Sequence, residues 1–204
     1  MREQGISPIP GSRGSRALRR ARQAGSIALT AMLTLSLLRH AKSSWKDPNL
    51  ADHERPLNTR GQAEAPVMGK AMTKHGLDPD LVLCSTARRT RDTLALVLPE
   101  LKTEPKVIYE DGLYHGTSAE MLGILHEVGA GVGQVLLVGH NPELQEFALD
   151  LIGSGPKLLK DRLEAKYPTA GLVVLRFPAG AWKDVAINSG KLELFLAPSD
   201  VKKS

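Results

Sequence analysis

The sequence contains one cysteine, Cys84, and few aromatic residues, which make up 4% of its 204 residues. A single cysteine excludes an internal disulfide and is typical of a reducing compartment, so we expect a cytoplasmic protein. Long apolar runs are also missing. The stretch from residue 27 to residue 38 is interrupted by hydroxyl side chains and is too short to span a bilayer, so we expect no membrane segment.

The excess of positive charge is confined to one end of the chain. Residues 1–31 hold six arginines and one acidic residue, whereas residues 32–204 hold 21 basic and 21 acidic side chains. Because residues 32–204 carry no net charge and few aromatic residues, the sequence argues against a nucleic-acid-binding protein. Residues 1–31 are rich in Gly, Ser, Pro and Arg without apolar periodicity, which predicts a disordered extension. Three interpretations of this extension remain open. It is an inert tail, a targeting segment, or sequence that lies upstream of a natural start at Met32.

Residues 32–204 are predicted to form one domain, in which apolar runs alternate with helical patterns. The runs predict strands at residues 33–38, 81–83, 106–109 and 135–138. The helical patterns predict helices at residues 58–75, 86–98, 118–127 and 142–151, with Asn58 and Ser118 as N-caps and Pro142 at a first helical position. Such alternation requires crossover connections, so the predicted fold class is α/β, with three α/β/α layers around a mostly parallel sheet. Shorter runs at residues 171–177, 185–188 and 191–196 predict antiparallel strands at its edge.

Two histidines each follow a predicted strand directly. His40 comes after Arg39 at the end of the first strand, and His140 follows the fourth strand. Another strand ends at Ser85, and Arg89 lies at the start of the helix after it. Ligands of open α/β sheets bind outside the carboxyl ends of the strands, so these side chains should meet there. Two imidazoles and two guanidiniums predict a pocket for a dianionic phosphoryl group.

Three rival sites do not fit the spacing. A cysteine phosphatase loop on Cys84 needs an arginine where Thr90 stands, with Arg89 one residue early and Arg91 one residue late. The glycine-containing stretch at residues 153–157 lacks the spacing of a Walker loop. No histidine, cysteine or carboxylate pattern matches a metal site, so we expect neither a metal nor a cofactor.

Four segments together resemble one known family. They are Leu37-Leu-Arg39-His40-Ala-Lys42-Ser43-Ser-Trp45, Asp52-His-Glu-Arg55-Pro56-Leu57-Asn58-Thr-Arg-Gly61, Ser85-x-x-x-Arg89-x-x-x-Thr93 and Val138-Gly-His140-Asn141-Pro142. In this order they are similar to the histidine phosphatase superfamily, whose fold is that of phosphoglycerate mutase, and within it to the SixA-like phosphohistidine phosphatases. The resemblance covers residues 33 to about 151 and departs from the usual Arg-His-Gly by having Ala41 after His40.

The resemblance implies a role for each residue at the strand ends. His40 would be the nucleophile, Arg39 and Arg89 would hold the phosphoryl oxygens, and His140 would donate to them from the other side. Physically, His40 must attack as neutral imidazole, with its far nitrogen held by a backbone carbonyl or a similar acceptor. His140 would serve best as a cation, and a negative ligand should raise its pKa relative to that of His40.

Other residues of these segments have open roles. Lys42 either adds a third cation or is solvated, and Asn58 either orients phosphate or only caps its helix. Asn141 is a further candidate for the phosphate pocket. The ester-cleaving relatives carry a general acid after the third strand, where Glu110 and Asp111 stand without a clean motif match.

The remaining histidines are weaker candidates for chemistry. The sequence predicts surface or loop positions for His53, His75 and His126. His115 remains undecided, since its place after Leu113 and Tyr114 puts it near the rim of the predicted site.

The predicted function is a cofactor-independent phosphatase that forms a phosphohistidine intermediate on His40. Its predicted partner is a phosphorylated protein such as a phosphotransfer domain. The sequence shows no clear general acid, and a leaving imidazole needs a proton much less than an alkoxide does, so phosphohistidine is the favoured substrate. A small-molecule phosphate monoesterase and an inactive phosphate-binding module remain as alternatives. A mutase is disfavoured because the interval from Arg89 to His140 lacks a long insertion. The sequence does not predict the oligomeric state.

Overall fold

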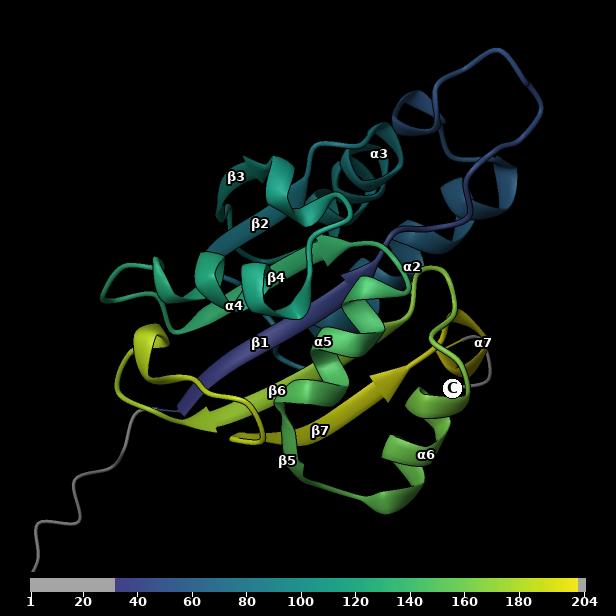
Figure 1. Cartoon of the computed structure of the whole chain (residues 1–204). Coiled ribbons are helices and arrows are strands. Elements are labelled where there is room, and N and C mark those ends of the chain that lie inside the picture. Colours follow the sequence, from purple (N-terminus) through teal and green to yellow (C-terminus); the bar gives the residue numbers. More distant parts are fainter. Residues whose placement is uncertain (1–31, 202–204) are drawn as a thin grey trace, which may run out of the picture. The chain divides into compact units, whose positions relative to one another are not determined.

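The computed structural model describes residues 32–201, so the predicted N-terminal extension lies outside the described residues. They form a seven-stranded sheet in the order β3-β2-β4-β1-β6-β7-β5 (Figure 1). The strands are β1 (Met32–Arg39), β2 (Leu81–Ser85), β3 (Lys106–Glu110), β4 (Gln134–Gly139), β5 (Ile152–Ser154), β6 (Leu172–Pro178) and β7 (Gly190–Leu196). The α-helices are α2 (Thr59–Lys74), α3 (Arg88–Val97), α4 (Ser118–His126), α5 (Glu143–Leu151), α6 (Lys157–Ala165) and α7 (Pro198–Val201). Four 3-10 helices connect them, η1 (Asp52–Glu54), η2 (Leu98–Glu100), η3 (Asp111–Leu113) and η4 (Trp182–Asp184).

The four strands of the first half of the sheet pair in parallel. β1 pairs with β4, β4 with β2 and β2 with β3, whereas β6 runs antiparallel to both β1 and β7. In the β1–β4 ladder Arg39 lies opposite Gly139, and the His40 N–H donates to the Gly139 carbonyl at 3.0 Å. This register places His40 and His140, each one residue beyond its strand, at the same edge of the sheet.

Alternate side chains of the central strands enter two separate cores, one on each face of the sheet. In β4, Val135 and Leu137 belong to one core, whereas Leu136 and Val138 belong to the other. The first core also contains apolar side chains of α4, α5 and α6, and the second contains those of α2 and α3. The predicted three-layer α/β/α class is therefore confirmed. Between residues 32 and 201 no helix has the length and apolar character needed to cross a membrane.

The predicted helix starts hold to within two residues. Asn58 caps α2, as predicted, by accepting a hydrogen bond from the Gly61 N–H at 2.9 Å. The cap of α4 is Thr117 rather than Ser118, because Thr117 and Glu120 form a reciprocal capping box. Pro142 stands one residue before α5, at its N-cap position rather than at the first helical position.

The prediction of a strand at residues 185–188 is wrong. The chain turns there: Asn188 has a φ of 58°, and its N–H donates to the Asp150 carbonyl at 2.8 Å. The edge position beside β7 belongs instead to the three-residue strand β5, in which Ile152 pairs with Gly190. A strand this short, with a glycine at its centre, has no apolar alternation by which the sequence could reveal it.

Gly61 in the first turn of α2 lies directly against the backbone of the loop that follows β1. A methyl group on Gly61 would collide with the Lys42 carbonyl oxygen and lie 2.9 Å from the Lys42 nitrogen. We therefore expect Gly61→Ala to lower the free energy of unfolding by about 1–3 kcal/mol, measured by urea denaturation. Gly123→Ala in α4 is the matched control, because a methyl group there meets no atom within 4 Å and should leave stability equal or slightly higher. Equal effects of the two substitutions would contradict this packing.

Candidate active site

The carboxyl ends of β1, β2 and β4 bring the predicted residues together. His40 and His140 are both buried, and their ring centroids lie 5.2 Å apart. Ser85, the last residue of β2, lies within 2.8 Å of the Nε2 atom of His140. Arg89, in the first turn of α3, is also buried. Residues separated by up to a hundred positions therefore share one site.

A backbone carbonyl fixes the tautomer of His40. Its Nδ1 lies 2.7 Å from the Ala41 carbonyl oxygen, which can only accept, so Nδ1 carries the proton and Nε2 keeps its lone pair. The pKa of His40 is lowered to about 3, mainly by burial; the positive charges of Arg89 and Arg39 act in the same direction, and the Ala41 hydrogen bond opposes them. The expectation of a neutral imidazole held by a carbonyl is confirmed.

The loop after β1 is tied to α3 through one hydroxyl group. The Thr93 Oγ1 accepts a hydrogen bond from the Ala41 N–H at 3.0 Å and donates to the Arg89 carbonyl at 2.6 Å. Thr93 is fully buried, so these bonds are shielded from water. The backbone that carries His40 and the backbone that carries Arg89 are thereby held in a fixed relation.

Main-chain carbonyls orient both arginines of the site. Arg39 donates from Nη1 to the Tyr167 carbonyl at 2.6 Å, and Arg89 donates from Nη1 to the Asp52 carbonyl at 2.7 Å. Within residues 32–201 the buried Nε atom of Arg39 has no hydrogen-bond partner. A buried charged donor without a partner is costly, so an anionic group that accepts from it would be stabilised here.

Without a bound phosphoryl group, the surroundings of His140 disfavour its charged form. Burial lowers the pKa of His140 to about 2, and the positive charges of His40, Arg89 and His115 act in the same direction. With the charges of this chain alone, His140 is therefore neutral at pH 7 rather than cationic. A phosphoryl dianion would add the negative charge that favours protonation.

Sequence reasoning missed a carboxylate that links three side chains of the site. Asp52, in η1, accepts from Arg55 at 2.6 Å and from the Tyr114 hydroxyl at 2.9 Å, and it pairs with Arg89 at 3.0 Å. Although partial burial raises the pKa of Asp52, the hydrogen bonds from Arg55 and Tyr114 and the charge of Arg89 lower it to about 2 overall. Asp52 and Arg55 stood three residues apart in a quoted segment, but Tyr114 gave no sequence signal.

The sequence of this chain is similar to that of a known family. A family model described as histidine phosphatase superfamily (branch 1) matches residues 35–115. An uncharacterized protein of Mycobacterium tuberculosis is 36% identical over 163 residues, which cover 79% of this chain and 99% of that relative. The chain belongs to the histidine phosphatase superfamily. This is the family that the four sequence segments predicted.

Two solved structures of histidine phosphatases have the same fold over most of this chain. A candidate SixA phosphohistidine phosphatase from Nakamurella multipartitia is 33% identical, with a TM-score of 0.69, and the match covers 82% of this chain and 96% of that one. A candidate SixA from Agrobacterium tumefaciens is also 33% identical, with a TM-score of 0.69, over 81% of this chain and 98% of that one. Their likeness confirms the histidine phosphatase fold.

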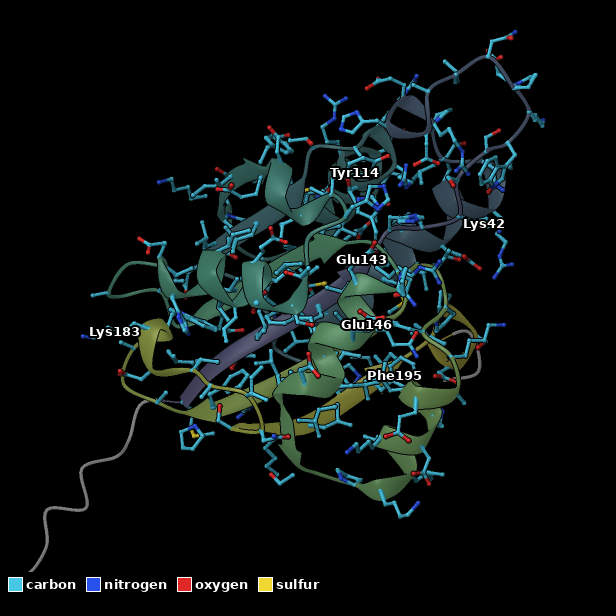
Figure 2. The ribbon with its side chains drawn as sticks, viewed as in Figure 1. Lys42, Tyr114, Glu143, Glu146, Lys183 and Phe195 are labelled. Carbon is cyan, nitrogen blue, oxygen red and sulfur yellow. The ribbon has the colours of Figure 1, made fainter. Side chains whose placement is uncertain are left out.

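The lower-ranked residues of the predicted phosphatase site lie in different surroundings. The Asn58 side chain is engaged in capping α2, and the Nδ2 of Asn141 donates to Gln145 at 2.8 Å. Lys42 is exposed beside the loop that leaves β1 (Figure 2). Glu110 lines a cavity of about 450 Å³ between β2, β3 and α4 that contains none of the four principal residues, and Asp111 is exposed in η3. Phosphate contacts of Lys42, Asn58 and Asn141 and a general-acid role for the two carboxylates stay predictions.

No metal centre competes with this interpretation in the part of the chain that the structure describes. It contains no group of three or more His, Cys, Asp or Glu side chains placed to hold a metal ion.

Replacing His140 with Gln should reduce the pH dependence of stability. An unfolded histidine has a pKa near 6.5, whereas the folded pKa is about 2 for His140 and about 3 for His40. The unfolded state therefore binds more protons between about pH 6.5 and pH 3, so the protein loses stability as the pH falls through this range. In urea titrations from about pH 7 to about pH 4, His140→Gln should lower the slope of unfolding free energy against pH by up to about 1.4 kcal/mol per pH unit. His40→Gln should act in the same direction, and unchanged slopes in both variants would contradict the assignment.

Proposed function

We propose that this protein is a phosphatase that transfers a phosphoryl group to His40 and then hydrolyses the phosphohistidine, with a phosphohistidine side chain of another protein as its substrate. The observation that carries the proposal is the hydrogen bond from His40 Nδ1 to the Ala41 carbonyl. In the neutral ring, which burial favours, this hydrogen bond keeps the proton on Nδ1 and leaves the Nε2 lone pair free to attack phosphorus.

The arginines supply the charge that a phosphoryl group needs. Phosphoryl transfer is catalysed mainly by positioning and by electrostatic stabilisation of the equatorial oxygens. Arg39 and Arg89 are oriented by main-chain carbonyls, and their charges reach His40, since both lower its pKa. Donors held in place in this way need little reorganisation when the charge on the phosphoryl oxygens develops.

The carboxylates near the site support phosphohistidine as the substrate class. Asp52 has a pKa of about 2 and is engaged by three side chains, so it cannot deliver a proton at neutral pH. Glu110 lines a separate cavity. Neither carboxylate is placed to supply the strong acid that an alkoxide leaving group needs, whereas imidazole leaving from a P–N bond makes a smaller demand that a weaker donor can meet. The names of the two SixA-like structures point to the same substrate class.

The test is phosphate release by the purified full chain from a phosphotransfer domain that carries phosphohistidine. His40→Ala should reduce the rate to background because the nucleophile is removed, and Arg89→Ala should lower kcat/KM by about 10²–10³-fold. His75→Ala, at an exposed position after α2, is the matched control and should retain the parent rate. Brief reaction followed by alkaline quench should show an alkali-stable, acid-labile phosphoryl group on the parent protein and none on His40→Ala.

The outcomes separate the alternative functions. Turnover of para-nitrophenyl phosphate without turnover of the phosphorylated domain would replace the substrate class by small phosphate esters. A stoichiometric phosphoryl group on His40 that is never released would instead identify a phosphate-binding module. Full activity in His40→Ala would overturn the proposed nucleophile.

A further inference from the structure

A histidine–carboxylate pair lies beside the site, and neither of its members has a role in the function proposed above. The Nδ1 of His115 lies 3.2 Å from the Oε1 of Glu143. The His115 side chain is 62% exposed, whereas that of Glu143 is 17% exposed. Figure 2 shows Glu143 and Tyr114, the residue before His115, near the carboxyl ends of β1 and β4. The pair therefore combines an accessible imidazole with a largely buried carboxylate.

The backbone holds His115 in an uncommon conformation. Its φ is 65°, in the left-handed region that few residues other than glycine adopt. The next residue, Gly116, is packed so closely that a methyl group there would collide with the Gly112 carbonyl oxygen. Sparsely populated conformations persist only where the surroundings impose them, and they concentrate at functional sites. The turn fixes the place at which the imidazole emerges.

His115 lies at the rim of the phosphoryl site, with the Tyr114 ring in contact with both His115 and His140. The ring of Tyr114 lies 4.2 Å from that of His115 and 5.3 Å from that of His140, measured between centroids. The pKa of His140 is lowered mainly by burial, then by His40 and Arg89. His115 is a further, smaller electrostatic cause. Glu143 begins α5, three residues after His140, so the carboxylate that holds His115 is anchored to the same segment as the site.

The other hydrogen-bonding groups nearby are already committed. The Tyr114 hydroxyl donates to Asp52, and the Ser85 hydroxyl is engaged with His140. In contrast, the buried Oε2 of Glu143 has no hydrogen-bond partner within residues 32–201. His53 also contacts Tyr114 and pairs with Glu54, but both of its ring nitrogens have partners, Glu54 and Thr86, and its side chain is 34% exposed, against 62% for His115.

We propose that His115 is the proton donor to the leaving group and that Glu143 positions it. This inference rests on the proposed phosphatase function and adds a residue to it. In the first step a P–N bond forms to His40 Nε2 while the bond from phosphorus to the leaving group breaks. The electron pair of that bond stays on the leaving group, whose proton comes from the His115 imidazolium. In the second step neutral His115 takes a proton from water as its oxygen bonds to phosphorus and the P–N bond to His40 breaks.

An imidazole donor matches the substrate class. Proton transfer is most effective when the donor and the group it serves have similar proton affinities at the working pH. A leaving imidazole and a donating imidazolium are the same chemical group, so their proton affinities are of the same kind. Exposure of His115 also leaves room for a leaving group that belongs to another protein.

The experiment measures kcat/KM of His115→Gln for two aryl phosphates whose leaving groups differ in their need for a proton. With phenyl phosphate, whose phenolate is a poor leaving group, the variant should lose about 10²-fold, whereas with para-nitrophenyl phosphate it should lose less than about 3-fold. On a phosphohistidine-bearing domain it should lose about 10-fold or more, and added imidazole should restore part of the rate of His115→Ala. Glu143→Gln should show the same leaving-group dependence with a smaller loss, because it disturbs the donor only indirectly. His75→Gln is the matched control and should leave every rate unchanged.

Several results would overturn this role. Equal losses on both aryl phosphates would show that His115 only supports the structure, and unchanged turnover of the phosphohistidine-bearing domain would show that it donates no proton. The proposed function fails by different results, namely the persistence of activity in His40→Ala or the absence of phosphate release from the phosphorylated domain by the parent protein. If the parent protein acts on none of the three donors, both proposals are wrong.

Discussion

The site depends on the pairing of β1 with β4. Parallel strands end at the same edge of a sheet, and the register that sets Arg39 opposite Gly139 brings two histidines from distant parts of the chain to a centroid distance of 5.2 Å. Both strands are buried on both faces, so two cores fix this register rather than one. A slip of one residue would exchange the faces of every side chain in the strand and turn His140 away from Ser85. The stability of the cores and the geometry of the site are thus consequences of the same pairing.

Positive charge gathers around imidazoles that remain neutral. Carbonyl oxygens of Tyr167 and Asp52 hold the two guanidiniums, and the Asp52 carboxylate balances part of their charge. The same guanidiniums, together with burial, lower the pKa of His40 and keep its lone pair available. Attraction of a phosphoryl dianion and preservation of the nucleophile therefore have a common electrostatic cause.

The sequence predicted the residues that stand at strand ends and missed those that come from irregular segments. His40, His140 and Arg89 could be placed because each follows a recognisable apolar run, and topology determines where such residues meet. Asp52 and Tyr114 lie in η1 and after η3, where no periodicity indicates a direction, and they meet only because the folded chain brings two such segments together. The edge strand β5 escaped prediction for a similar reason, since three residues are too few to show a pattern.

The hydrogen bonds around Ser85 allow a tautomer in which His140 donates without a positive charge. The Ala87 N–H approaches the Ser85 hydroxyl oxygen at 3.5 Å, and the hydroxyl lies 2.8 Å from the Nε2 of His140. In the tautomer in which the Ser85 hydroxyl donates to Nε2, the proton of the neutral ring resides on Nδ1. Within residues 32–201 that buried Nδ1 has no partner. In that tautomer a neutral His140 carries a buried N–H group, and a phosphoryl oxygen that accepts from it would satisfy a donor whose burial is otherwise uncompensated.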